Sequence, residues 1–159
     1  MVTEVLQLVL LTLVPGLELR ASIPYGILLL PVSWPMVVLI CVVTNALLGP
    51  LVYLLLTLCV EWLRKIPFLD RMYQKAIVHT QKKVHPYVER YGVWGLALFV
   101  GIPLPGSGSY TGALAAYVLG LDAKRFAFAN LIGVILAAIA VTLITLSGNE
   151  LFNLFIKVI

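Results

Sequence analysis

The sequence predicts an all-α polytopic membrane protein with two inverted repeats, each a re-entrant helical hairpin plus one spanning helix, joined by a cytoplasmic amphipathic helix. Of the 159 residues, 62% are hydrophobic and only 11% are charged, whereas soluble domains contain about 25% charged residues. Most Lys and Arg residues are concentrated in the stretch 61–91. Two runs rich in Pro and Gly, residues 15–26 and 101–112, interrupt apolar sequence. A single transmembrane domain over residues 1–159 is therefore expected.

The first repeat covers residues 1–60. Residues 5–14 form an apolar run that is too short to cross a bilayer, and a second short run ends at Pro31. Between them lies PGLELRASIPYG, which we expect to form the tip of a re-entrant hairpin. The expected tip backbone includes Pro15, Gly16, Pro24 and Gly26. Residues 36–60 then give a helix long enough to span the membrane with some tilt.

The connector 61–91 carries seven of the eleven Lys and Arg residues. By the positive-inside rule it should be cytoplasmic. Its apolar residues follow helical spacing, so we expect an amphipathic helix in the interface, which either binds an anionic leaflet or is basic only to set topology. His79 and His85 are expected to be solvated, because no cysteine or acidic cluster lies near them to complete a metal site.

The second repeat covers residues 92–148. Lys124 and Arg125 should also be cytoplasmic, so the segment 92–121 must leave the cytoplasm and return to it, although it is too short for two spans. Irregular backbone at membrane depth persists only where protein or a wet cavity satisfies it. We therefore expect a hairpin tip built from Pro103, Pro105, Gly106, Gly108 and Gly112. A span should follow over 126–146, and residues 149–159 should form a short interfacial helix on the outer surface.

The two repeats share a few residues at an offset of 85 to 86. Gly26 matches Gly112, and the Asn45-to-Gly49 segment is similar to the segment that begins at Asn130. A single spanning helix between two hairpins places them on opposite membrane faces, so the repeats would be inverted. Many secondary transporters have inverted repeats with a site near the midplane.

Glu18 and Arg20 are the sharpest functional signal in the sequence, because they are the only charges between Glu4 and Glu61. Ionisable groups at membrane depth usually mark a pathway for ions or substrates. Arg20 would bind an anionic group through paired hydrogen bonds. Glu18 would carry a proton, because burial disfavours the charged form of a carboxylic acid. Alternatively, the two residues neutralise each other or cap broken helix ends.

The second tip offers backbone and hydroxyl groups in place of charges. A helix that begins there would attract an anion at its N-terminus. The candidate substrate-binding residues, beside Arg20, are Ser107, Ser109, Tyr110, Thr111, Asn45 and Asn130. Two alternatives remain open: the spacing of Gly112, Ala116 and Gly120 is also typical of close helix packing, and the two asparagines could simply form hydrogen bonds between helices.

The runs PGLELRASIPYG and GIPLPGSGSYTGALAAYVLGL, together with the chain length, resemble the small multidrug export protein family over most of residues 10–140. More distantly, the Pro-Leu-Pro-Gly turn and the Asn-x-x-Gly helix resemble the DedA superfamily. That resemblance implies proton-dependent transport or flipping of lipids such as polyprenyl phosphate, and it transfers charged roles only to Glu18 and Arg20. Ser107 replaces the acid that DedA proteins often carry after Pro-Gly, so the second tip would be half of an anion site.

We therefore expect a multi-pass protein of the prokaryotic cell membrane that exports or translocates a small amphipathic or anionic substrate, with lipid phosphates among the candidates. Transport would be proton-coupled and would proceed by alternating access between the two hairpins. The alternatives are a non-transporting structural membrane protein and, less favoured, a membrane-embedded lipid-modifying enzyme. An enzyme would need a nucleophile with its base, or a metal, at membrane depth.

The expected partners follow from this interpretation. They are membrane lipids, a small-molecule or lipid substrate and further copies of the chain, because two spans and two hairpins are little protein to enclose a pathway. A homodimer or a higher oligomer with closed symmetry is expected. No cofactor, metal or nucleic acid is expected.

Overall fold

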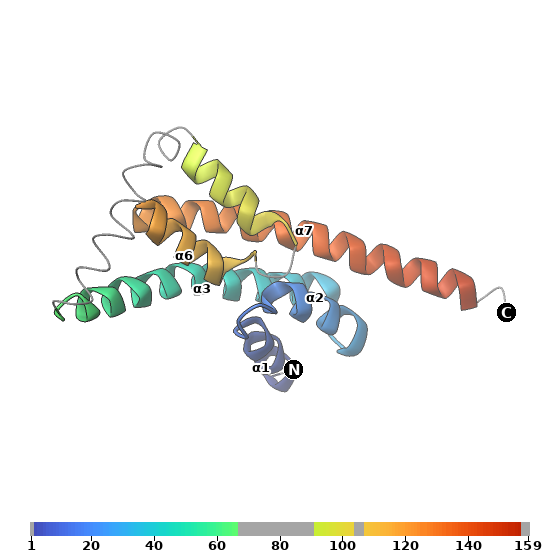
Figure 1. Cartoon of the computed structure of the whole chain (residues 1–159). Coiled ribbons are helices and arrows are strands. Elements are labelled where there is room, and N and C mark those ends of the chain that lie inside the picture. Colours follow the sequence, from blue (N-terminus) through green and yellow to red (C-terminus); the bar gives the residue numbers. More distant parts are fainter. Residues whose placement is uncertain (1, 67–90, 104–106, 157–159) are drawn as a thin grey trace.

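The structure, a computed structural model, describes residues 2–66, 91–103 and 107–156, and these ranges contain helices and loops without a strand (Figure 1). The described helices are, in chain order, α1 (Val2–Thr12), α2 (Glu18–Leu29), α3 (Trp34–Leu63), a helix over Tyr91–Gly101, α6 (Ser109–Leu119) and α7 (Ala123–Ile156). The expectation of an all-helical chain is confirmed for these residues. Each half has the same order: two short helices, then one long helix.

The long helices α3 and α7 run side by side in opposite directions (Figure 1). Their segments Trp34–Trp62 and Ala123–Gly148 are long and apolar enough to cross a membrane, as expected. One expectation needs correction, because α7 continues through Gly148 to Ile156. Residues 149–156 are thus the last turns of α7 and do not form a separate helix. A glycine inside a helix costs only about 1 kcal/mol relative to alanine, and this segment contains no proline that would end the helix.

Two apolar clusters form the core, and each is built mainly on one hairpin. The first joins α1 and α2, with Val100 of the second hairpin, to the start of α3 and the middle of α7; its members include Leu8, Ile23, Val37 and Val134. The second joins the Tyr91–Gly101 helix and α6 to the start of α7, with the second half of α3 packed against it; its members include Leu96, Ala113, Phe126 and Ala129. The two hairpins therefore pack mainly against opposite halves of α3, and they meet α7 at successive stretches that adjoin near Gly133.

Close packing inside each hairpin depends on a glycine in its second helix. A Cβ at Gly26 would lie less than 3.0 Å from the side chains of Leu8 and Val37. A Cβ at Gly112 would lie 2.6 Å from Val100. A larger residue at Gly26 would push α2 away from α1 and α3, and one at Gly112 would push apart the two helices of the second hairpin. This is the packing role that small residues have between membrane helices.

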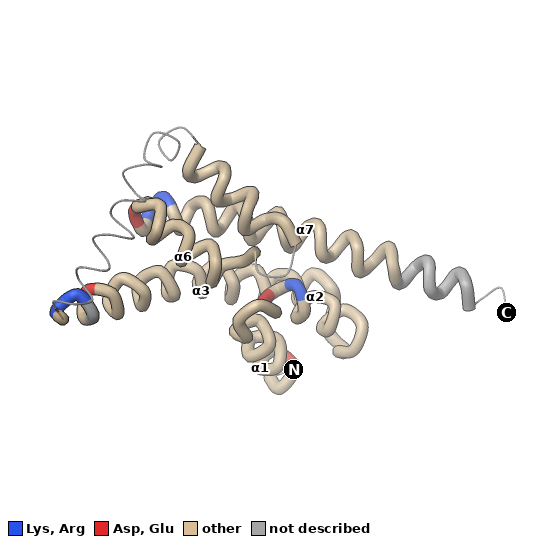
Figure 2. Tube along the Cα trace, viewed as in Figure 1, with Lys and Arg blue, Asp and Glu red and all other residues tan. Residues whose placement is uncertain are grey.

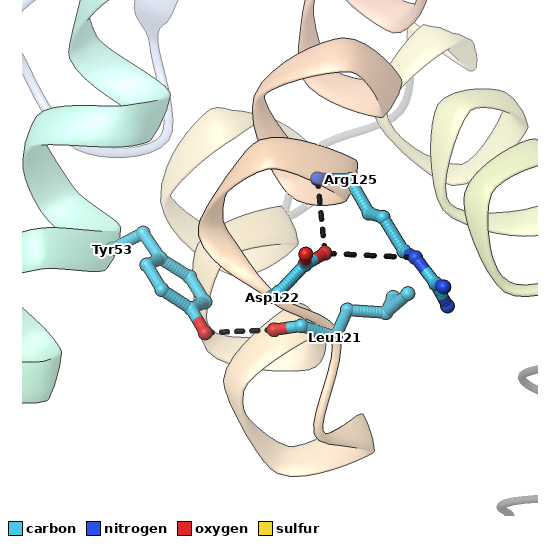
Figure 3. Close-up of polar contacts among 4 residues, drawn as sticks. All are labelled: Tyr53, Leu121, Asp122 and Arg125. Carbon is cyan, nitrogen blue, oxygen red and sulfur yellow. Dashed lines mark hydrogen bonds and ion pairs between the residues drawn. The ribbon is translucent and has the colours of Figure 1, made fainter.

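A polar corner fixes the junction between α6 and α7 (Figure 3). Gly120 adopts a left-handed conformation with φ 74°, which ends α6. The Tyr53 hydroxyl of α3 donates to the carbonyl of Leu121 at 2.7 Å. Asp122 Oδ1 accepts the N–H of Arg125 at 3.1 Å and therefore caps the N-terminus of α7. The exposed Arg125 side chain also lies 3.7 Å from that carboxylate through Nε.

The charged ends of α3 and α7 lie at the same end of the molecule, whereas most of both helices carries no charge (Figure 2). This end carries Lys124 and Arg125, and it is also where the connector 61–91 leaves α3. Residues 67–90 of that connector, with His79 and His85, lie outside the described residues. The amphipathic connector helix therefore stays a prediction.

Candidate site between the two hairpin tips

Glu18 occupies an unusual backbone position at the turn between α1 and α2. Its φ is +49°, and among the described residues it is the one non-glycine residue with a positive φ. Such a conformation costs on the order of 1–3 kcal/mol and persists only where surrounding contacts hold it. The N–H of Glu18 donates to the carbonyl of Val14 at 3.2 Å. The residue is 3% exposed, and it is the one buried charged residue in the described part of the chain.

The Glu18 carboxylate binds the first turn of α6, which belongs to the other hairpin. Oε2 accepts the N–H of Ser109 at 3.0 Å and the Nδ2 of Asn45 at 3.1 Å. Oε1 accepts the N–H of Tyr110 at 3.4 Å. The backbone N–H groups of Ser109 and Tyr110 have no partner inside α6, and the dipole of α6 favours a negative charge at this end. Glu18 is therefore the N-terminal cap of α6, supplied from 91 residues earlier in the chain.

Gly108 makes this contact possible. A Cβ at Gly108 would lie 2.6 Å from Glu18 Oε2, and it would be closer still to Oε1. The backbone of the second tip and the carboxylate of the first tip therefore meet directly at this point. Gly108 has an extended backbone, so the space around it, and not its conformation, requires a glycine.

Arg20 binds the other broken end of the second hairpin. Its Nη2 donates to the carbonyls of Val100 and Ile102 at 3.3 and 3.1 Å and to the Ser107 hydroxyl at 3.2 Å. Carbonyls at the end of a helix lack intrahelical donors, and a cation is favoured there. Arg20 therefore caps the end of the Tyr91–Gly101 helix. Both charges act as helix caps across the two tips, which agrees with the capping alternative stated above.

Tyr110 makes the reciprocal contact. Its hydroxyl donates to the carbonyl of Leu13, just after α1, at 2.6 Å. If the two Pro-Gly pairs at 15–16 and 105–106 are aligned, at an offset of 90, Arg20 aligns with Tyr110 and Glu18 with Gly108. Each hairpin thus extends a side chain from the same position to the carbonyls that end the first helix of the other hairpin. The offset of 85 to 86 does not reveal this relation.

Asn45 and Asn130 join the long helices beneath the tips. Pro50 has no N–H, so the carbonyl of Ala46 loses its helical donor. Asn130 Nδ2 lies 3.4 Å from that carbonyl and 3.4 Å from the carbonyl of Asn45. The Ser109 hydroxyl of α6 also donates to the carbonyl of Asn45 at 3.4 Å. The two asparagines, both buried, are therefore hydrogen-bonded between helices and also lie within the network of Glu18.

Three polar atoms of the site keep unused hydrogen-bonding capacity. Asn45 Oδ1, Asn130 Oδ1 and Arg20 Nε are buried and have no partner among the described residues. A buried polar atom without a partner costs about 1–3 kcal/mol. The site therefore has two acceptors and one donor whose hydrogen-bonding capacity is not used by the described residues.

Several residues that were predicted to form the hairpin tips lie inside helices instead. Pro24 and Gly26 are inside α2, and Gly112 is inside α6, so they do not form the tips as expected. Helices in membranes tolerate an internal proline where neighbouring groups satisfy the freed carbonyl. Thr111 accepts the N–H of its neighbour Gly108 at 2.9 Å and acts locally.

The remaining expected tip residues lie closer to the turns. Pro15 and Gly16 lie in the first turn, where Gly16 has φ 84°. Pro103 lies in the second turn, and Ser107 donates to the carbonyl of Ile102 at 2.7 Å. Pro105 and Gly106 lie outside the described residues.

Thr12 and Ser22 are part of the first hairpin's buried polar structure, and the sequence interpretation missed them. Their hydroxyl oxygens lie 2.7 Å apart and connect α1 to α2. Ser22 also donates to the carbonyl of Glu18 at 3.1 Å and so supports the strained turn. The available signal was the presence of two hydroxyl residues in otherwise apolar short helices that must pack together.

The family model described as "Putative small multi-drug export protein" matches residues 18–140, which is more than half of the chain. The match begins at Glu18 and includes both spanning candidates as far as Ala140. The chain matches no curated protein and no solved structure.

Proposed function

We propose that this chain, which belongs to the small multi-drug export protein family, is a proton-coupled membrane transporter of a small amphipathic or anionic substrate. Membership of an export family implies a protein that is not an enzyme, and the two long apolar helices indicate a membrane location. The proposal for mechanism rests on one observation: the buried Glu18 carboxylate of one hairpin binds the backbone amides of Ser109 and Tyr110 in the other.

Protonation of Glu18 would weaken the contact between the tips. Hydrogen bonds to an ionised carboxylate are about twice as strong as neutral ones. A neutral acid also loses its favourable interaction with the α6 dipole. The proton would therefore release α6 from the first hairpin, and deprotonation would restore the contact. Glu18 would hold the two tips together when it is ionised and release them when it is protonated.

An anionic substrate would compete with Glu18 for the same donors. Once the carboxylate leaves, the N–H groups of Ser109 and Tyr110 form a free helix N-terminus, which is a favourable site for phosphate or carboxylate. Arg20 lies beside it on the Ser107 hydroxyl and has an unused Nε. Substrate and deprotonated Glu18 would then exclude each other, which couples substrate exchange to proton movement.

The arrangement of the helices supports alternating access. The hairpins pack mainly against opposite halves of α3, an arrangement that fits inverted repeats whose re-entrant hairpins enter from opposite membrane faces. The basic ends of α3 and α7 would face the cytoplasm. Opening one hairpin at a time would expose the Glu18 site to one side. Because two spans enclose little volume, the working unit would be a homodimer or a higher oligomer in the cell membrane.

A non-transporting structural membrane protein is the second candidate. The observation that favours it is that Glu18, Arg20 and Tyr110 all cap helix ends, which is a sufficient structural reason for their presence. On that interpretation the contacts between the tips would never open.

A reconstituted assay separates the two candidates. Proteoliposomes that contain the full chain, an entrapped pH dye and fluorescent phosphatidic acid as the anionic amphiphile would report proton flux and lipid translocation together. We expect a pH gradient to drive translocation by the wild type, and Glu18→Gln to abolish its dependence on the gradient. Glu61→Gln, which changes an exposed carboxylate at the end of α3, is the matched control. Equal proton flux through the wild type and through Glu18→Gln would favour the structural candidate.

A further inference from the structure

The Glu18 carboxylate is surrounded by hydrogen-bond donors. Its three partners among the described residues are the N–H groups of Ser109 and Tyr110 and the Nδ2 of Asn45. This arrangement suits an ionised carboxylate, which only accepts hydrogen bonds. A protonated carboxylic acid is different, because its O–H needs an acceptor. A buried O–H without an acceptor is costly, so the neutral form of Glu18 requires a change among its neighbours.

Asn45 carries the acceptor that a protonated Glu18 needs. Its Oδ1 is buried and has no hydrogen-bond partner among the described residues, while its Nδ2 donates to Glu18 Oε2 at 3.1 Å. The two atoms belong to one planar amide of nearly symmetric shape. A half-turn about the last side-chain torsion therefore exchanges their places with little demand for extra space. The unused oxygen of Asn45 is thus one rotation away from Glu18.

The charged and titratable groups that face Glu18 do not offer this acceptor. Arg20 of α2 and Tyr110 of α6 lie close enough to interact with its charge. Arg20 has no acceptor atom, and the Tyr110 hydroxyl is bound to the carbonyl of Leu13. In α1, Glu4 lies in the first turn, at the opposite end from Glu18. The described charges of α3 and α7 lie at one end of the molecule (Figure 2).

The Ser109 hydroxyl is the alternative acceptor. It belongs to α6, and it donates to the backbone carbonyl of Asn45 at 3.4 Å, which leaves its oxygen able to accept. An acid that donates to Ser109 would stay bound to α6. An acid that donates to the Asn45 side chain would instead be held on α3. Only the second arrangement agrees with release of α6 on protonation.

We propose that Asn45 is the positioning residue for the proton on Glu18: its amide donates to the ionised carboxylate and, after rotation, accepts the O–H of the neutral acid. This inference rests on the proposed function, because it names where the acid is held once α6 is released. The proton stays on Glu18 throughout. Protonation would therefore move Glu18 from a partner on α6 to a partner on α3.

Infrared difference spectroscopy between high and low pH tests this role, on the full chain in lipid nanodiscs with an isotopic carbon label in every asparagine side-chain carbonyl. Among the described residues, Asn45 is the asparagine that contacts the Glu18 carboxylate. We expect a carboxylic acid C=O band at low pH and, with it, a downward shift of one labelled amide band, because an amide C=O that accepts a hydrogen bond absorbs at lower frequency. Both changes should be lost in Glu18→Gln.

Two variants separate the two possible acceptors. Asn45→Leu has a similar volume but no acceptor, so it should remove the amide shift and move the acid band to higher frequency. Ser109→Ala removes the alternative acceptor and should leave both bands in place. The amide shift is measured in the wild type itself, so the proposal remains testable even where Asn45→Leu does not fold.

The outcomes distinguish this inference from the proposed function. The absence of a Glu18 acid band at every pH would overturn the proposed function, and this inference with it. A Glu18 band without an amide shift, an acid band of unchanged frequency in Asn45→Leu, or an acid band that moves in Ser109→Ala would overturn the role of Asn45 alone.

Discussion

The two hairpins have the same order of helix, turn and helix, but they contribute different chemistry to the point where they meet. The first hairpin provides the charged side chains Glu18 and Arg20, whereas the second provides backbone amides, carbonyls and the Ser107 hydroxyl. At the tip of the second hairpin one helix ends and another begins, which leaves carbonyls and amides without partners in their own helices. Arg20 of the first hairpin binds the carbonyls, and Glu18 binds the amides. Neither tip is therefore complete without the other.

This difference has a consequence for the way in which the tips can separate. If the residue of the second hairpin that aligns with Glu18 were also an acid, two carboxylates would meet at the same point and repel each other. The aligned residue is Gly108, which leaves room for a single carboxylate. One ionisable group at the contact between two otherwise similar hairpins can respond to one proton.

The largest expected effect is that of Gly108→Ala. The added methyl group would displace the Glu18 carboxylate from α6, so we expect a loss of about 2–4 kcal/mol in the free energy of unfolding from overpacking and lost charged hydrogen bonds. Unfolding in mixed micelles measures this change. Gly95→Ala is the matched control, because its Cβ would meet no atom within 4 Å.

A double variant tests whether the cost of Gly108→Ala comes from Glu18. With Glu18→Ala already present, the added methyl group has no carboxylate to displace, so the two losses should not add. Additive losses would mean that Gly108 and Glu18 act independently, which would contradict the direct contact between the tips.

Smaller effects should distinguish the aligned residues Arg20 and Tyr110. Arg20→Met removes charged hydrogen bonds to two carbonyls and a hydroxyl, so it should cost about 1.5–3 kcal/mol. Tyr110→Phe removes one neutral hydrogen bond to Leu13 and should cost about 0.5–1.5 kcal/mol. The same unfolding measurement applies to both, and the reverse order would show that the second hairpin, and not the first, provides the stronger cap.

The spans and the location of the charged site could be predicted from the sequence, because long apolar runs and isolated charges are strong signals in lipid. The partners of Glu18 and Arg20 could not, because they depend on how the two tips approach each other in space. The Pro-Gly alignment at an offset of 90 was present in the sequence and would have paired Glu18 with Gly108. The offset of 85 to 86 instead followed glycines whose role is helix packing, together with the two asparagines that join α3 to α7.

Proline explains the other differences. Pro24 and Gly26 suggested a turn, since both residues end helices in soluble proteins. In α2 both are accommodated within the helix, and Gly26 allows close contact with Leu8 and Val37. Pro50, which the sequence interpretation did not single out, frees the carbonyl that Asn130 binds. Such effects depend on neighbours that are distant in sequence.

Hydrogen exchange at the second tip tests the central claim most directly, namely that Glu18 holds α6 and releases it when protonated. The measurement compares wild type and Glu18→Gln in nanodiscs over a range of pH, with rates corrected for intrinsic exchange. We predict that the amides of Ser109 and Tyr110 are protected in the wild type at high pH and lose protection as the pH falls. In Glu18→Gln they should be weakly protected at every pH. Equal protection of these amides in both proteins at all pH values would contradict the account.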